Sequence, residues 1–478
     1  MLLFRFMAVA QEQLGLRLEN YAGVSGISLN PASNLTNPLR WDLNLVGAGA
    51  FFENNYVFIK GTSTLDLLKN AENLEFMLSE DAVGNEAEQV RLVDFRNDGS
   101  NRFLSVGNFV AGPSLVVRIN ENHSAGIYTG FRVAASALDI SDNFSYYVYD
   151  EKPLFDPFQV GAFKVALMSW SEIGVNYALR IPTDAGFMGM GINVKKLTGY
   201  EAAYLENTAT WTHTKLPNDN VSVGGVNGRY GLTTSNLKNN DYGAERNGSG
   251  FGFDLGFLYV VQENDESYKW RFGASILDIG SIRFDKNAQT HVVNNPNTFQ
   301  LNLRDFDDFE LPGEGEALLL HFSEQALGNP TASLRGDNFK MALPTAISMQ
   351  ADYNVNDQLF LNGLLVHPVP IGPVSPGRQP LLAFTPRFEH RWFSASIPVS
   401  LLNWRKTNLG LAARLGFLVI GSDNIGSIFG KSDYSGTDIY AALKLNPFDL
   451  GWGLFKGRGV GNGKERRGSK KKVRCYNF

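Results

Sequence analysis

SWSEIGVNYALRI, residues 169–181, carries the strongest structural signal in the sequence, because its side chains alternate strictly between two kinds. The apolar set is Ile173, Val175, Tyr177, Leu179 and Ile181. The other set is small or polar: Glu172, Gly174, Asn176, Ala178 and Arg180. A period of two places each set on one face of a β-strand, whereas a helix would scatter both sets around its circumference. The stretch therefore predicts a long, two-faced strand.

The same alternation recurs along the chain, at residues 251–261 and 408–419 and in shorter form in six further segments. A soluble β-sandwich also alternates, so strand length and face chemistry must decide. Strands of about 9 to 11 residues suit a tilted crossing of a membrane, and the small, polar minority face suits a wet lumen. The sequence predicts an all-β fold, a transmembrane antiparallel β-barrel, with a soluble all-β protein as the alternative.

Composition agrees with this prediction. The 478 residues include 34 Phe, 17 Tyr and 49 Gly, and only 19% are charged. After the first ten residues no apolar stretch reaches the roughly 18 residues of a spanning helix. The single cysteine, Cys475, excludes an internal disulfide and a thiolate metal cage, and the six histidines show no ligand spacing. No metal or cofactor is expected.

The chain divides into four predicted parts. Residues 1–10, MLLFRFMAVA, resemble the end of a signal peptide, with a frayed terminus or a core strand as the alternative. Residues 11–38 carry Gly and Asn-Pro punctuation instead of alternation, and we expect them to fold into the lumen as a plug. Residues 39–455 form the barrel, with long polar extracellular loops at 61–101, 141–161, 207–250 and 285–340.

Residues 456–478 form a tail with nine basic residues and one acid, Glu465. The basic candidates are Lys464, Arg466, Arg467, Lys470, Lys471, Lys472 and Arg474. A run of this kind is commonly a solvated, disordered tail. The functional alternative is a periplasmic contact for an acidic partner or an anionic polymer.

Charged residues on the minority face are the candidates for the lumen: Arg132, Glu172, Arg180, Asp254, Arg387, Glu389 and Arg414. They carry both signs, so they either pair with one another or line a substrate path. No catalytic constellation is present. GRGVGNGK, residues 457–464, is followed by Glu465 where a phosphate-binding loop requires Ser or Thr, and no serine or acid can be assigned to His390. We therefore predict that the protein is not an enzyme.

The chain resembles uncharacterised outer-membrane barrel proteins of Bacteroidetes. The resemblance is carried by residues 14–56 (LGLRLENYAGVSGISLNPASNLTNPLRWDLNLVGAGAFFENNY), 252–259 (GFDLGFLY), 271–284 and 343–357. More distantly, Asn30-Pro31-Ala32 followed by barrel strands is similar to the long-chain fatty-acid transporter superfamily, which includes the shuttle barrel of type IX secretion. This resemblance implies about fourteen strands and an N-terminal plug, for which Tyr21, Asn30, Pro31 and Ala32 are the candidate residues.

The leading hypothesis places the protein in the cell outer membrane, in contact with its lipid, where it takes up a hydrophobic or amphipathic small molecule. The alternative is a scaffold or secretion accessory barrel that binds other envelope proteins through its loops and tail. A nucleic-acid partner is not expected.

Overall fold

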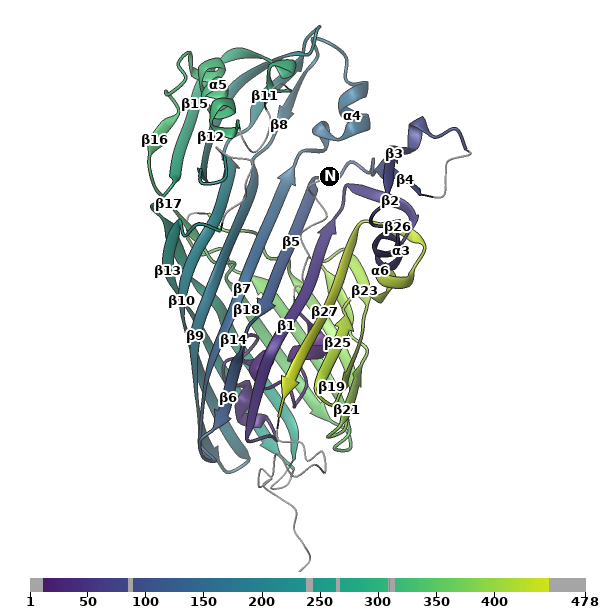
Figure 1. The fold of residues 1–478 in the computed structure, drawn as a ribbon, viewed down its shortest axis with the longest axis vertical. Helices are drawn as coiled ribbons and strands as arrows, with labels where there is room; N and C mark the ends of the chain where they lie inside the picture. The colour runs from purple at the N-terminus through teal and green to yellow at the C-terminus, as the bar shows by residue number, and fades with distance from the viewer. Residues whose placement is uncertain are drawn as a thin grey trace, which may run out of the picture.

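The computed structural model describes residues 12–84, 89–237, 244–263, 267–307, 309, 314–372 and 374–446. In this part of the chain, fourteen antiparallel barrel strands close into a ring, and some of them consist of two strands in succession (Figure 1). In ring order they are β1 (Trp41–Asn54), β5 (Arg102–Ala111) with β6 (Ser114–Arg118), β7 (His123–Ile140), β9 (Phe163–Thr183), β10 (Gly186–Asn207), β13 (Gly248–Gln262), β14 (Tyr268–Phe284), β17 (Phe339–Ala342) with β18 (Ala346–Asn354), β19 (Leu359–Pro368), β20 (Leu381–Glu389), β21 (Phe393–Ser396) with β22 (Val399–Leu402), β23 (Lys406–Leu409) with β24 (Leu411–Leu415), β25 (Leu418–Ser422) and β27 (Gly436–Leu445).

Pairing of β1 with β5 and β6 on one side and with β27 on the other closes the ring. The predicted closed antiparallel barrel of about fourteen strands is confirmed. No helix in the described ranges is long and apolar enough to cross a membrane.

Alternation along the strands separates an apolar outer face from a polar inner face. On β9, Ile173 is 60% and Val175 is 54% exposed, whereas Glu172 and Asn176 on either side of them are buried. The same inversion holds on β13, where Phe251 is exposed and Asp254 is buried. A folded chain that points its large apolar side chains outward needs an apolar environment around it.

The two ends of the barrel differ in the length of their connections. At the lower end in Figure 1 the turns are short, for example residues 184–185 and 416–417. The alternating run 408–419 is therefore not one strand as the sequence predicts. Gly416, with φ +59°, reverses the chain between β24 and β25. Positive φ is readily adopted by glycine, so this residue marks the turn that alternation alone does not reveal.

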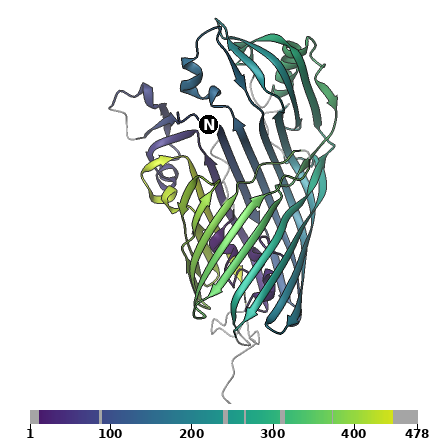
Figure 2. The same cartoon turned by 180° about the vertical axis from the view of Figure 1, so that it is seen from behind.

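The long connections lie at the upper end and contain further strands and short helices (Figures 1 and 2). One group comprises β8 (Pro157–Val160), β11 (Trp211–Lys215), β12 (Asn220–Thr233), β15 (Ala288–Asn302), η4 (Leu303–Phe306), α5 (Gly315–Leu327) and β16 (Leu334–Gly336). The other comprises β2 (Val57–Thr62), α3 (Thr64–Lys69), β3 (Glu75–Leu78), η2 (Ser79–Asp81), β4 (Val90–Phe95), α6 (Ile425–Phe429) and β26 (Ser432–Tyr434). Between them lie η3 (Asp142–Phe144) and α4 (Tyr146–Glu151).

Residues 12–40, the N-terminal segment, lie inside the lower half of the barrel (Figure 1, purple). The segment folds into three short helices, α1 (Leu14–Arg17), α2 (Val24–Ile27) and η1 (Ser33–Thr36). Leu14, Ile27 and Leu29 are almost fully buried. The expected signal peptide, residues 1–10, and the expected basic tail, residues 456–478, lie outside the described residues.

Candidate functional site

Inward-facing polar side chains of the wall hold the N-terminal segment. Short helices and the turns between them leave most of their backbone carbonyls without helical partners, so these groups need donors from elsewhere. The bonds are Asn176 Nδ2 to the Pro31 carbonyl (2.9 Å), Asn193 Nδ2 to the Ile27 carbonyl (2.9 Å) and Ser275 Oγ to the Leu29 carbonyl (2.7 Å). On the other side of the ring, the Tyr440 hydroxyl accepts from the Gly15 amide at 2.8 Å. The small, polar inner face of the barrel thus binds the backbone of this segment through hydrogen bonds.

The four predicted plug residues all contact the wall. The Arg414 guanidinium lies 4.5 Å from the centre of the Tyr21 ring. Asn30 donates from Nδ2 to the Phe257 carbonyl at 3.1 Å. Pro31 and Ala32 lie against Gly191 of β10, where an added Cβ would stand 2.4 Å from the Ala32 nitrogen.

A first buried ion network lies above the segment, centred on Asp278 of β14. Arg132 donates to both Asp278 oxygens, at 2.7 and 3.0 Å, and lies 3.6 Å from Glu172. Lys195 bridges Asp278 at 2.7 Å and Asp254 at 2.8 Å. The network joins three of the predicted lumen candidates, Arg132, Glu172 and Asp254.

A second network lies on the opposite wall. Arg387 reaches Asp352 at 2.6 Å and Glu389 at 2.5 Å. Arg414 pairs with Glu19 of the N-terminal segment at 2.8 Å. Arg180, the remaining candidate, joins neither network in the described part of the chain. Its guanidinium lies 4.1 Å from the Phe187 ring centre, towards the lower end.

Several charged residues of these networks are not identified from the sequence, among them Lys195, Asp278 and Arg378, which lies 3.6 Å from Asp278. Lys195 lies on the minority face directly after an alternating run, so an extension of that run would have found it. Asp278 has φ +56° at an irregularity in the pairing of β13 with β14, and its neighbours do not alternate. Arg378 lies in a Pro- and Gly-rich connection, where no periodicity exists to assign a face.

A cavity of about 140 Å³ lies between the N-terminal segment, the first ion network and the wall formed by β1, β5 and β7. Its apolar side includes Leu16, Val24 and Ile27 of the segment together with Phe51 and Phe109 of the wall. The charged side chains that line it are Arg17, Arg132, Lys195 and Arg378 with the carboxylates Glu172, Asp254 and Asp278. Each of them has an oppositely charged partner, which for Arg17 is Glu12 behind the lining. The cavity therefore offers apolar contact beside a charge-balanced polar floor.

Within the described ranges, no three His, Cys, Asp or Glu side chains are placed to hold a metal ion. His390 lies in the turn 390–392 at the lower end, with its ring 5.1 Å from that of Phe393, and it does not line the cavity.

The comparisons with known proteins concern most of the chain. The family DUF5723, described as a family of unknown function, matches residues 31–423. Among curated proteins, none matches this sequence at a significant level.

Several solved outer-membrane barrels are similar to this chain at low identity. The toluene transporter TbuX of Ralstonia pickettii is 7% identical, with a TM-score of 0.33 over 93% of this chain and 100% of TbuX. A FadL homologue of Pseudomonas aeruginosa is 12% identical, with a TM-score of 0.24 over 92% of this chain and 97% of that protein. The toluene transporter TodX of Pseudomonas putida is 11% identical, with a TM-score of 0.24 over 92% of this chain and 95% of TodX.

Proposed function

The chain belongs to the DUF5723 family of unknown function, and we propose that it is an outer-membrane barrel that takes up a hydrophobic or amphipathic small molecule without changing it chemically. The observation that carries the proposal is a cavity inside a barrel whose outer face is apolar. Sites for small apolar molecules are concave and mostly apolar, with a few polar groups that fix orientation.

The outer surface supports the membrane location. Large apolar side chains are exposed at alternate positions of adjacent barrel strands, such as Ile173 and Val175 on β9, Met190 on β10 and Phe251 and Phe253 on β13. A contiguous apolar surface of this extent is unfavourable in water and favourable in lipid. The short turns at one end and the long connections at the other follow the usual division between the periplasmic and outer sides of such barrels.

The interior supports uptake through the lumen. The N-terminal segment is the plug of this proposal, since it fills the lower half of the lumen and is held by side-chain hydrogen bonds that a conformational change can exchange for water. A molecule that enters from the upper end would reach the cavity and rest against Leu16, Val24 and Ile27 of the plug. Passage then requires the plug to move.

Filling the cavity tests the proposal. Ala134 of β7 lines the cavity, whereas Ala135 follows it on the opposite face of the same strand. We expect Ala134→Trp to slow entry of the neutral fluorescent probe N-phenyl-1-naphthylamine into cells that carry the barrel, and Ala135→Trp to leave entry unchanged. Heat-modifiable migration in gels verifies that both variants fold. Equal uptake by folded Ala134→Trp and native barrels would refute a route through this cavity.

A second candidate function, a scaffold for envelope proteins, is favoured by the upper-end structure. Leu303, Leu320 and Leu334 expose 40% or more of their surface on the group that contains α5 and β16. Gentle detergent extraction should then recover a stoichiometric partner, and polar substitution of these three leucines should release it. A barrel that purifies alone from native membranes would leave the uptake function as the better account.

A further inference from the structure

The connection between β19 and β20 enters the lumen instead of staying at the rim. Residues 374–380, the strap, begin where the Val374 carbonyl accepts from Ala342 of β17 at 2.7 Å. The Gly377 amide then donates to Ser136 Oγ of β7 at 2.7 Å. β7 lies about halfway round the ring from β20, so the strap crosses the lumen above the cavity.

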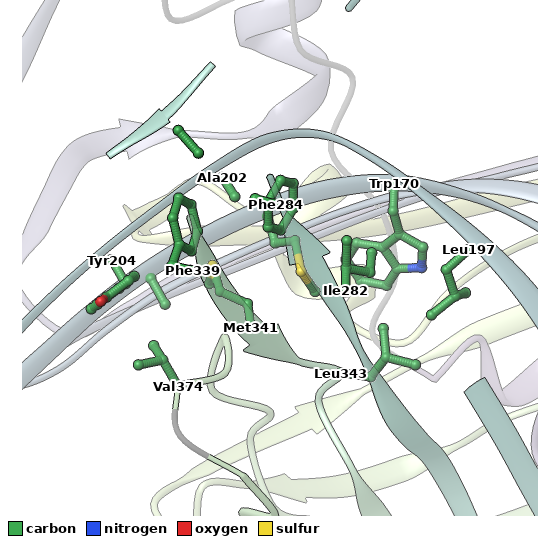
Figure 3. Close-up of a cluster of buried hydrophobic side chains, with 13 residues drawn as sticks. Trp170, Leu197, Ala202, Tyr204, Ile282, Phe284, Phe339, Met341, Leu343 and Val374 are labelled. Carbon is green, nitrogen blue, oxygen red and sulfur yellow. The ribbon is translucent and has the colours of Figure 1, made fainter. Parts of the chain in front are cut away.

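Apolar packing fixes one end of the strap. Val374 belongs to a buried cluster of the upper lumen that includes Trp170, Phe284, Phe339 and Met341, in which β9 and β10 face β14 and β17 (Figure 3). At the far side, Gly377 lies against β7 so closely that an added Cβ would stand 2.6 Å from the Leu138 side chain. The strap is therefore packed tightly against the barrel interior at both Val374 and Gly377.

One side chain of the strap joins it to the N-terminal segment. Arg378 donates three hydrogen bonds to the Glu12 carboxylate, at 2.6, 2.8 and 2.9 Å. The pair is shielded from water, since the Arg378 side chain is 9% and the Glu12 side chain 0% exposed. Arg17 lies 3.7 Å from the same carboxylate, and Asp278 lies 3.6 Å from Arg378. The pair thus connects the strap and the segment to each other and to the first ion network.

We propose that Arg378 and Glu12 form a latch that couples the upper and lower closures of the lumen. Separating a buried ion pair leaves each charge without its partner in a poorly solvated site, which is strongly unfavourable. Displacement of the strap therefore weakens the hold on the N-terminal segment, and displacement of the segment weakens the hold on the strap. Such coupling is reciprocal. A molecule that pushes past the strap loosens the plug beneath the cavity, and this role rests on the uptake function proposed above.

Thiol labelling in the full-length barrel tests the latch without any transport assay. In a Cys475→Ser background, Ser25→Cys places a reporter on the cavity side of the N-terminal segment. A charged, membrane-impermeant maleimide is added from outside. We expect Arg378→Gln to raise the labelling rate on the order of tenfold or more, because the Glu12 carboxylate then no longer holds the strap. Arg304→Gln is the matched control, since Arg304 pairs with Asp219 at the exposed upper end.

A latch predicts that removing either partner frees the other segment, whereas an arginine with a purely structural role does not. A second reporter, Ser375→Cys on the strap, should label faster in Glu12→Gln. The double variant Glu12→Gln/Arg378→Gln should match the single variants, because both remove the same interaction. Arg378→Lys keeps the charge and should restore slow labelling in part, and it serves as the working variant where Arg378→Gln fails to fold.

Labelling that is equal in the Arg378 and Arg304 variants, or additive effects of the two latch substitutions, would overturn the latch. If the labelling rates change as expected but the barrel takes up no probe, the latch stands and only the uptake function is rejected.

Discussion

At the scale of single residues, the closest packing lies where the wall meets the N-terminal segment. Gly191 leaves no room for a Cβ beside Ala32, whereas at Gly363 of β19 the nearest atom would be 4.0 Å away. We predict that Gly191→Ala destabilises the barrel or its segment by about 1 to 3 kcal/mol through overpacking, and that Gly363→Ala is tolerated. Urea unfolding in detergent measures both. Equal midpoints for the two variants would show that the segment does not press on β10.

Outward-facing residues give the second prediction at this scale. Ile173 lies on the apolar outer face of β9, and Ile119 is exposed in the lower turn between β6 and β7. Arginine at the lipid midplane costs about 2 to 4 kcal/mol and much less near the interface. Ile173→Arg should therefore lower the yield of folded barrel in lipid vesicles far more than Ile119→Arg does. Similar yields would contradict the assignment of the β9 outer face to lipid.

Periodicity identifies individual residues of the inner wall only where they share the alternation of a strand. Arg132, Glu172 and Asp254 are identified because each follows the period of two on its own strand. Arg378 and Glu12 are not, since their pairing depends on how two irregular segments meet in the lumen. The period of a strand gives the face of a side chain, but irregular backbone carries no such rule.

At the scale of elements, long alternating strands are the predictable part of the fold and the upper-end structure is not. Residues 220–233 and 288–302 pair as β12 and β15, although their Asn and Gly content indicates loops. Their stability comes from tertiary packing, in which Val223, Val293 and Ala326 share a buried cluster with α5. Packing of this kind overrides local propensity.

Two histidines make the upper-end structure sensitive to acid. Burial lowers the pKa of both His213, on β11, and His291, on β15, to about 4. The unfolded imidazole binds a proton below about pH 6.5. Between about pH 4 and pH 6.5 the unfolded state thus binds more protons than the folded state. The free energy of unfolding therefore falls as the pH falls from about 6.5 to about 4.

We predict that hydrogen exchange in β11, β12 and β15, corrected for the intrinsic pH dependence, accelerates through this range while β9 stays protected. His213→Phe, which keeps an aromatic ring between Phe144 and Phe158, should reduce the acceleration. His390→Gln, in a lower turn, serves as the control. Protection that is independent of pH in the native protein would contradict the buried state of these rings.

At the scale of the whole molecule, the barrel is a closed wall with an occupied lumen. Removal of residues 12–38 deletes the three short helices and exposes the polar inner face that binds them. Water would then fill the lower lumen. We predict that this deletion raises the leakage of small solutes from proteoliposomes well above that of the intact barrel, whereas the conservative Gly363→Ala variant leaks no more than the native protein. Unchanged leakage in a correctly folded deletion variant would contradict the plug.

The central claim is that the lumen cavity receives a small apolar molecule. A structure of the intact barrel soaked with 1-bromonaphthalene tests it most directly, because anomalous scattering locates the bromine independently of the protein. We expect a bromine peak between Ile27 and Phe109 that is lost in Ala134→Trp. Bromine found only on the outer, lipid-facing surface would contradict it.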